Sequence, residues 1–199
     1  EASFAGMQET YLNIKGVQEV REAVKKCWAS LFNTRAVYYR KKQGFGTEKT
    51  GIAVVVQKMV NSESSGIMFT AEPQTGDQSK IIIEAGYGLG EAVVSGSITP
   101  DTYTIEKLGM KISGKKIAKQ AWLLERSVQG NKKIEIPEER QELQKIRDEQ
   151  ITELAKLGRQ IEQHYGMPQD IEFAIEKGKI FIVQTRAITT LKAVRAVQE

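Results

Sequence analysis

Between Pro168 and Arg186 the chain reads PQDIEFAIEKGKIFIVQTR, and this stretch decides the fold of the carboxy-terminal part. Polar and apolar residues alternate on both sides of Lys177-Gly178, which is the pattern of a two-stranded hairpin. One face of such a hairpin would carry two carboxylates, an amide and a guanidinium, from Asp170, Glu172, Gln184 and Arg186. This set of groups on one sheet face predicts a site for a metal ion and phosphate groups.

The length of the connecting loop determines which side chains share a face. A two-residue turn at Lys177-Gly178 would place Glu172 on the same face as Phe181 and Val183. Gln184 would then point the other way. Because a shift of one residue in register reverses both faces, the loop decides whether the polar cluster exists.

We expect the longer, three-residue loop Glu176-Lys177-Gly178, because Gly178 suits the positive φ that this loop requires. Asp170 then lies opposite Gln184, with Glu172 one diagonal step away. The other face becomes an apolar core face of Ile171, Phe173, Ile175, Phe181 and Val183. An amphipathic hairpin whose charged face is simply exposed to water fits the same pattern, since charged residues normally lie at the surface.

Length and composition are those of a soluble globular protein. The 199 residues are enough for one core or two small lobes, and 40% of them are hydrophobic and 27% charged. The single cysteine, Cys27, excludes an internal disulfide and fits the cytoplasm, which we predict as the location. No stretch has the length and apolarity of a membrane span, so we expect no membrane partner. The chain begins with Glu1 rather than Met, which favours a fragment of a longer protein.

The chain is basic, with a net charge of +4 and a pI of about 9.0. The basic residues are scattered, and no aromatic residues are interleaved with them in a stripe. We therefore expect no nucleic-acid partner, although a basic pI keeps that alternative open. A small anionic ligand such as a nucleotide fits the charge better.

The predicted elements mix helices and strands. Apolar residues recur at the helical period over residues 17–39, so Cys27 and Trp28 are expected in a buried stripe. A second, longer helix is expected over residues 137–165. Strands are predicted for residues 51–60, 65–71, 80–85 and 102–106, with short lysine-rich strands over residues 107–137.

Other candidate residues carry weaker signals. Cys27 has no neighbouring base to activate it, and His164, the only histidine, lies in the last turn of a predicted helix, where a surface or capping role is expected. The stretch GYGLGE at residues 86–91 follows a strand, so it is either a phosphate-binding loop or a tight structural turn. The stretch QKMV at residues 57–60 could offer backbone groups to a base or be ordinary core.

Together these segments form a recognisable order. The stretches are EASFAG at 1–6, QKMV at 57–60, SGIMFT at 65–70, GLGE at 88–91, TPDTY at 99–103, HYG at 164–166, DIE at 170–172 and QTR at 184–186. In this order the chain resembles the nucleotide-binding domain of the phosphoenolpyruvate synthase (pyruvate, water dikinase) family. The superfamily also includes pyruvate phosphate dikinase, rifampicin phosphotransferase and the glucan, water dikinases.

The resemblance implies an α+β fold of the ATP-grasp type, a mostly antiparallel sheet with two long helices. Residues 1–186 would form a partial nucleotide-binding domain, and residues 187–199 would begin the linker to a phosphohistidine domain. The family's amino-terminal lobe, its phosphohistidine domain and its pyruvate-binding barrel have no counterpart in this chain.

The resemblance also implies roles for individual residues with ATP and Mg²⁺. Glu172 and Gln184 match the magnesium positions, Arg186 matches a residue that neutralises phosphate oxygens, and Asp170 matches a ribose or phosphate neighbour. Adenine would bind along Gln57, Lys58, Met59 and Val60, and the phosphates would lie under a loop containing Gly6 and Thr10. Met7 stands where many members carry Gln, which weakens only that single contact.

The activity implied is the conversion of ATP, pyruvate and water to AMP, phosphoenolpyruvate and phosphate, through a histidine of the absent phosphohistidine domain. His164 lies outside that histidine motif. The chain alone is expected to be inactive. A small-molecule phosphotransferase of the rifampicin type and a non-catalytic nucleotide-binding protein are the alternatives.

Overall fold

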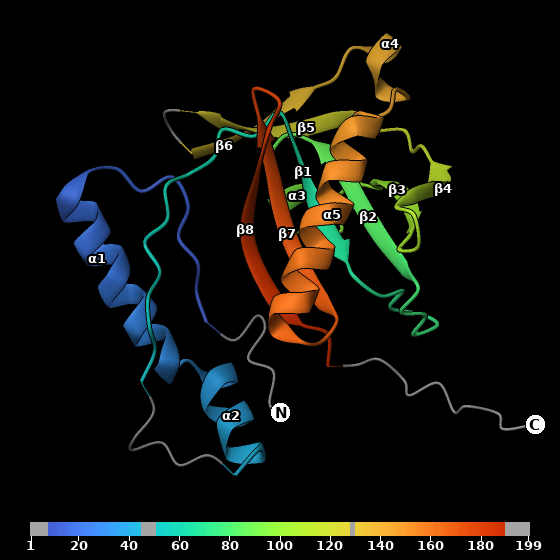
Figure 1. Cartoon of the computed structure of the whole chain (residues 1–199). Coiled ribbons are helices and arrows are strands. Elements are labelled where there is room, and N and C mark those ends of the chain that lie inside the picture. Colours follow the sequence, from blue (N-terminus) through green and yellow to red (C-terminus); the bar gives the residue numbers. More distant parts are fainter. Residues whose placement is uncertain (1–7, 45–50, 128–129, 190–199) are drawn as a thin grey trace, which may run out of the picture. The chain divides into compact units, whose positions relative to one another are not determined.

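The computed structural model describes residues 8–44, 51–127 and 130–189. The chain divides into two compact units, Glu1–Met59 and Val60–Glu199. The described residues form helices and an antiparallel sheet, which confirms the predicted α+β class (Figure 1). None of the helices in these ranges combines the length and apolarity that crossing a membrane requires.

The amino-terminal unit contains two helices, α1 (Gly16–Ala29) and α2 (Thr34–Lys42), joined by the short 3-10 helix η1 (Ser30–Phe32). The prediction of one helix over residues 17–39 is therefore wrong. The chain leaves the helical conformation at Asn33, whose side chain accepts a hydrogen bond of 2.7 Å from the Ala36 amide and caps α2. The predicted buried stripe is also wrong, because α1 buries no residue and Trp28 is 52% exposed.

Residues 51–60 form no strand, contrary to the prediction. Their β-branched side chains suit a strand, but an extended segment becomes a strand only by hydrogen bonding to a neighbour. Both Val55 and Val56 are largely exposed. Side-chain propensity was therefore a poor guide in this segment.

The second unit is built on a six-stranded sheet in the order β4-β3-β2-β1-β7-β8, and every neighbouring pair is antiparallel. Its strands are β1 (Ser64–Phe69), β2 (Lys80–Tyr87), β3 (Asp101–Glu106), β4 (Lys111–Lys116), β7 (Gln169–Glu176) and β8 (Lys179–Ala187). A separate ribbon pairs β5 (Trp122–Ser127) with β6 (Gly130–Glu135). The predicted strands in this unit are confirmed, with ends that shift by one or two residues.

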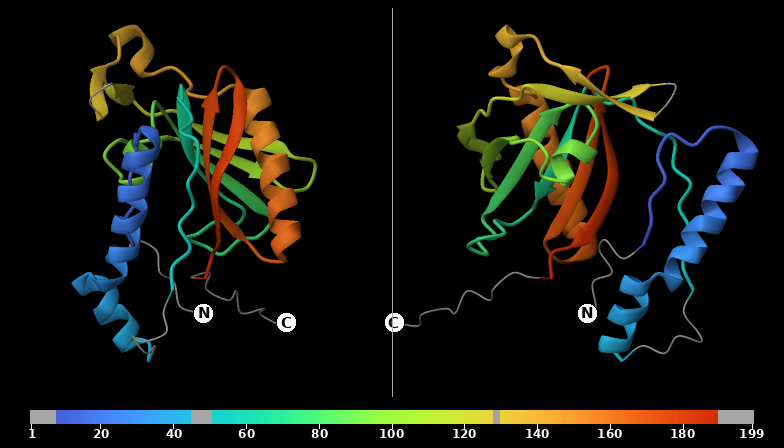
Figure 2. Two further views of the ribbon diagram at one scale, coloured as in Figure 1. Left: turned by 90° about the vertical axis from the view of Figure 1, so that its left-hand side faces the viewer. Right: turned by 180° about the vertical axis from the view of Figure 1, so that it is seen from behind.

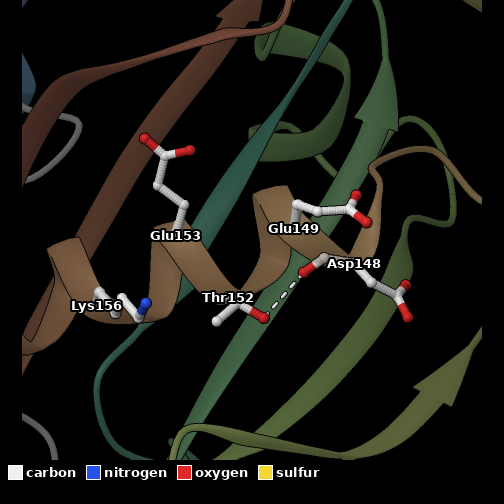
Figure 3. Close-up of a pocket in the computed structure, with 5 residues that line it drawn as sticks. All are labelled: Asp148, Glu149, Thr152, Glu153 and Lys156. Carbon is white, nitrogen blue, oxygen red and sulfur yellow. Dashed lines mark hydrogen bonds between the residues drawn. The ribbon is translucent and has the colours of Figure 1, made fainter.

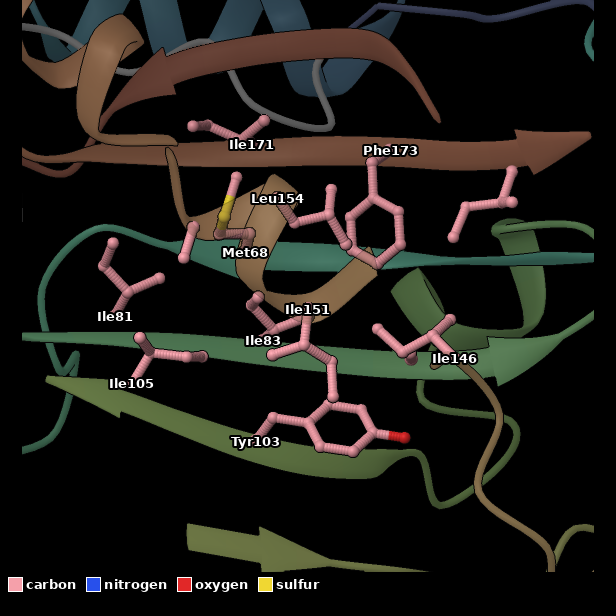
Figure 4. Close-up of a cluster of buried hydrophobic side chains, with 13 residues drawn as sticks. Met68, Ile81, Ile83, Tyr103, Ile105, Ile146, Ile151, Leu154, Ile171 and Phe173 are labelled. Carbon is pink, nitrogen blue, oxygen red and sulfur yellow. The ribbon is translucent and has the colours of Figure 1, made fainter. Parts of the chain in front are cut away.

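Helix α5 (Asp148–Tyr165) covers one face of this sheet (Figures 1 and 2). It buries Ile151, Leu154 and Ala155 against side chains of four strands. Figure 4 shows this core, which includes Met68, Ile81, Ile83, Tyr103, Ile105, Ile171 and Phe173. The right-hand view of Figure 2 shows the opposite face, with α5 behind the sheet. At one end of that face, Val93 of the short helix α3 (Glu91–Val94) lies beside Gly86.

The prediction of one continuous helix over residues 137–165 is wrong, because the helix is interrupted between Gln141 and Asp148. A short helix α4 (Glu138–Gln141) precedes α5, and the chain between them is held by the buried Asp101. Asp101 accepts hydrogen bonds from the Lys145 amide at 2.9 Å and from Tyr103 Oη at 2.7 Å. Its carboxylate also lies 3.1 Å from Lys145 Nζ, and neither side chain is exposed. The Lys145 amide, which a continuous helix would direct to a backbone carbonyl, thus bonds to Asp101 instead.

Close packing around residue 66 explains why β1 carries a glycine there. A Cβ at this position would lie 1.9 Å from the Glu84 carbonyl oxygen and 2.9 Å from Cζ of Phe173. The missing side chain therefore lets β2 and the Phe173 ring approach β1 closely.

Candidate functional site

The hairpin of β7 and β8 has a two-residue turn and a β-bulge. Glu176 pairs with Lys179, so the turn consists of Lys177 and Gly178, which have φ of 51° and 76°. Positive φ at both residues is the geometry of a type I′ turn. The predicted three-residue loop is therefore wrong. Further from the turn, the register shifts between Glu172 and Phe173.

The bulge restores the polar face that a two-residue turn would otherwise remove. Phe173 pairs with Ile182, whereas Glu172 pairs with Gln184, so Val183 is the extra residue of β8. Gln184 thus shares a face with Glu172, as predicted, and Arg186 lies opposite Asp170. The prediction that Asp170 lies opposite Gln184 is wrong.

The two-residue turn also changes which residues of β8 reach the core. Ile180 and Ile182 pack against the core cluster, because they pair with Ile175 and Phe173. The predicted core positions Phe181 and Val183 are therefore wrong. The core face of β7 is as predicted, since Ile171, Phe173 and Ile175 are all buried.

The structure brings together the four polar residues of the hairpin on the face turned away from α5. Arg186 donates from Nε to Asp170 Oδ2 at 2.7 Å, and its Nη2 lies 2.6 Å from the same oxygen. The Arg186 side chain is 50% exposed and the Asp170 side chain 12%. Nη1 takes no part in this ion pair, so it can contact a ligand while Asp170 fixes the orientation of the guanidinium.

Glu172 lies half-buried beside this ion pair. Burial raises the pKa of the Glu172 carboxyl, the charge of Asp170 raises it further, and the charge of Arg186 lowers it. Across the described ranges, the carboxylate has no hydrogen bond or salt bridge. An unpaired carboxylate in this setting is suited to bind a cation.

Glu84 also lies on this face, where the sequence pattern did not predict it. Cross-strand pairs join one row over all six strands, formed by Lys116, Thr102, Glu84, Ile67, Glu172 and Gln184. Glu84 is therefore two strands from Glu172, on the other side of Ile67. Burial raises the pKa of the Glu84 carboxyl. The sequence feature that could have pointed to Glu84 is its position as a single acidic residue at the end of the apolar run Ile81–Ile83.

The other predicted ligand residues belong to segments of the chain outside the hairpin. Thr10 is exposed, and the neighbouring Glu9 amide donates to Ser30 Oγ at 3.3 Å within the amino-terminal unit. Gln57, Lys58 and Met59 belong to the same unit, whereas Val60 begins the second. Gly6 and Met7 lie outside the described residues. The structure thus assembles the hairpin part of the predicted site.

Two further observations concern candidates beyond the hairpin. His164 is exposed in the last turn of α5 and packs edge-on against Tyr165. This placement agrees with the surface role predicted for it. Within the described ranges, no three His, Cys, Asp or Glu side chains gather as metal ligands. A metal site at the hairpin would therefore depend on the Gln184 amide and on ligand oxygens besides Glu172.

A shallow surface depression of about 590 Å³ lies on the outer side of α5 (Figure 3). It is lined by Asp148, Glu149, Thr152, Glu153 and Lys156, all from one helix. The Thr152 hydroxyl bonds to the Asp148 carbonyl, and the Asp148 carboxylate pairs with Lys115. The depression contains none of the predicted ligand residues, so we assign it no role.

Comparison with known proteins identifies a family over the full length. The family model for the "Pyruvate phosphate dikinase, AMP/ATP-binding domain" matches residues 1–199. A probable phosphoenolpyruvate synthase of Archaeoglobus fulgidus is 55% identical over 96% of this chain and 25% of its own length. The phosphoenolpyruvate synthase of Pyrococcus furiosus is 52% identical over 100% of this chain and 26% of its own length.

The relatives also include a second kind of phosphotransferase. The rifampicin phosphotransferase of Bacillus subtilis is 45% identical over 96% of this chain and 22% of its own length. The chain therefore spans about a quarter of the length of the curated relatives that it matches.

Proposed function

Because this chain belongs to the pyruvate phosphate dikinase AMP/ATP-binding domain family, we propose that it is the ATP-binding part of a phosphoenolpyruvate synthase-like dikinase with an ATP-grasp fold. The complete reaction would convert ATP, pyruvate and water to AMP, phosphoenolpyruvate and phosphate. In this proposal the chain holds ATP while phosphoryl groups pass to a histidine of another domain. That domain and the pyruvate site would belong to the rest of the protein.

The donor set at the hairpin fits Mg²⁺. Glu172 and Gln184 are opposite one another and supply oxygen atoms, which are the ligands that Mg²⁺ prefers. The Glu172 carboxylate is half-buried and forms no hydrogen bond or salt bridge with another side chain within the described ranges. When bound there with ATP, Mg²⁺ would neutralise charge on the phosphate oxygens.

The protein side chains would act by position and charge. Arg186, held by Asp170, would direct its remaining nitrogen toward a phosphate oxygen. Glu172 would remain ionised through the cation that it binds, although burial alone favours its protonated form. The linker Gln57–Val60 would bind the adenine ring. Such arrangements accelerate phosphoryl transfer mainly by orientation and electrostatic stabilisation.

The observation that carries this proposal is the shared face of Glu172 and Gln184 across the bulge. In the full-length protein that carries this chain, we expect Glu172→Gln to abolish AMP formation from ATP. Glu176→Gln is the matched control, because it makes the same chemical change next to the turn of the same hairpin. An unchanged rate for Glu172→Gln would remove Glu172 from the site.

A rifampicin-type phosphotransferase is the second candidate, supported by the 45% identity to the Bacillus subtilis enzyme. The higher identity to the synthases favours the first candidate. Both would use the nucleotide face in the same way, and the acceptor would be selected by other domains. Assaying AMP formation with pyruvate and with rifampicin distinguishes them.

A further inference from the structure

The glycine-rich turn after β2 uses its backbone amides within the protein. The Tyr87 amide donates to Gln120 Oε1 at 2.8 Å, and the Gly88 amide donates to the Glu63 carbonyl at 2.9 Å. The Leu89 amide donates to the Leu124 carbonyl at 2.8 Å. Three consecutive amides are therefore occupied, which leaves them unable to bind a phosphate group.

The Gly88 carbonyl anchors the chain where it enters the sheet. It accepts hydrogen bonds from Ser62 Oγ at 3.1 Å and from Ser65 Oγ at 2.6 Å. Between these serines, the Glu63 amide donates to the Ile175 carbonyl of β7 at 2.8 Å. The entry segment Ser62–Ser65 is thus fixed to the turn on one side and to the hairpin on the other.

Gly88 is required for this arrangement. It has a φ of +85°, and a Cβ there would lie 2.4 Å from the Leu124 carbonyl oxygen. Any other residue would therefore push the turn away from β5 as well as strain the backbone.

We propose that the turn at Gly88 is a positioning element for the adenine-binding linker. The linker ends at Val60, two residues before Ser62, so hydrogen bonds at Ser62–Ser65 fix the point from which the linker extends. The same segment also bonds to β7, so the Gly88 turn and the hairpin together hold the residues that follow the linker. This inference rests on the proposed function and adds a role for residues that do not touch the nucleotide.

The test is the double variant Ser62→Ala/Ser65→Ala in the full-length protein, since it removes both bonds to the Gly88 carbonyl. We expect the KM for ATP to rise about tenfold, the scale of one to two lost hydrogen bonds, with kcat changed less than about twofold. Adenosine should lose affinity by the same factor as ATP, because in the proposed function the linker would bind the base, which both ligands share. Ser62→Ala alone, at the less buried serine, should show a smaller shift in the same direction.

The matched control is Ser95→Ala/Ser97→Ala, which removes two exposed hydroxyls that bond only to each other in the described structure. Unchanged constants for both ATP and adenosine in the Ser62/Ser65 variants would overturn the positioning role. A loss confined to ATP would also overturn it, by making the turn a phosphate-binding loop. Failure of the unmodified protein to bind either ligand would instead contradict the proposed function.

Discussion

Glu172 and Gln184 lie directly opposite one another across β7 and β8, although the turn between these strands has two residues. A regular ladder from that turn would place Ile180, Ile182, Gln184 and Arg186 on one face. The extra residue Val183 divides this set, so the isoleucines reach the core and the polar pair reaches the open face. One β-bulge therefore creates both the end of the core and the proposed ligand face.

The first prediction concerns the cost of the buried carboxylates. Burial raises the pKa of Glu84 and of Glu172 above the ordinary value of 4.5. The folded state therefore holds these protons more tightly than the unfolded state, and both groups destabilise the fold as the pH rises through their raised pKa values. We expect Glu84→Gln and Glu172→Gln to increase the melting temperature of the chain at pH 7.

Near pH 3.5 the same variants should have the melting temperature of the unmodified chain, because the carboxyls are then protonated in both the folded and the unfolded state. Glu125→Gln, at an exposed position of β5, serves as the control and should have no effect at either pH. A lower melting temperature of the two variants at pH 7 would contradict the assignment of unpaired, partly buried charge.

The second prediction concerns Arg186. The planar fork of arginine contacts Asp170 with two nitrogens and keeps a third for phosphate. Lysine keeps the charge but lacks this fork. We expect Arg186→Lys to reduce AMP formation by the full-length protein by about 10- to 100-fold. Arg159→Lys, at an exposed position of α5 that bonds to the Lys107 carbonyl, should leave the rate unchanged. Equal rates for both variants would show that charge alone is needed at residue 186.

The third prediction concerns the buried pair of Asp101 and Lys145, whose side chains are both fully buried 3.1 Å apart. Asp101→Asn leaves the Lys145 ammonium without its counter-charge, which should cost about 3–5 kcal/mol of unfolding free energy in urea. Adding Lys145→Met should recover part of this loss. Asp77→Asn, which breaks a partly exposed pair with Lys80, should cost less than about 1 kcal/mol. Similar losses for the two aspartates would contradict the structural role of Asp101.

The fourth prediction concerns the chain by itself. The family resemblance assigns part of the phosphate-binding surface to regions outside this sequence, so we expect the 199-residue chain to bind Mg-ATP weakly and to form no AMP. Isothermal titration calorimetry measures this directly. Micromolar affinity of the isolated chain would show that its own residues suffice for binding.

The sequence predicted the strands of the second unit and the polar face of the hairpin because alternation of side chains records burial directly. It could not predict the bulge at Val183, since a two-residue turn with a bulge and a three-residue loop without one leave the same polar residues on one face. The interruption of the helix before α5 was also hidden, because it depends on Asp101, which lies 44 residues before Lys145. The break at Asn33 was locally readable, as asparagine followed by a helical segment is a common cap.

The most direct test is a crystal structure of the full-length protein with Mn²⁺ and a non-hydrolysable ATP analogue, using anomalous scattering to locate the metal. We expect an Mn²⁺ peak in contact with the side-chain oxygens of Glu172 and Gln184 and with the phosphates, on the sheet face away from α5. A metal bound elsewhere, with these two side chains free of it, would contradict the proposed site.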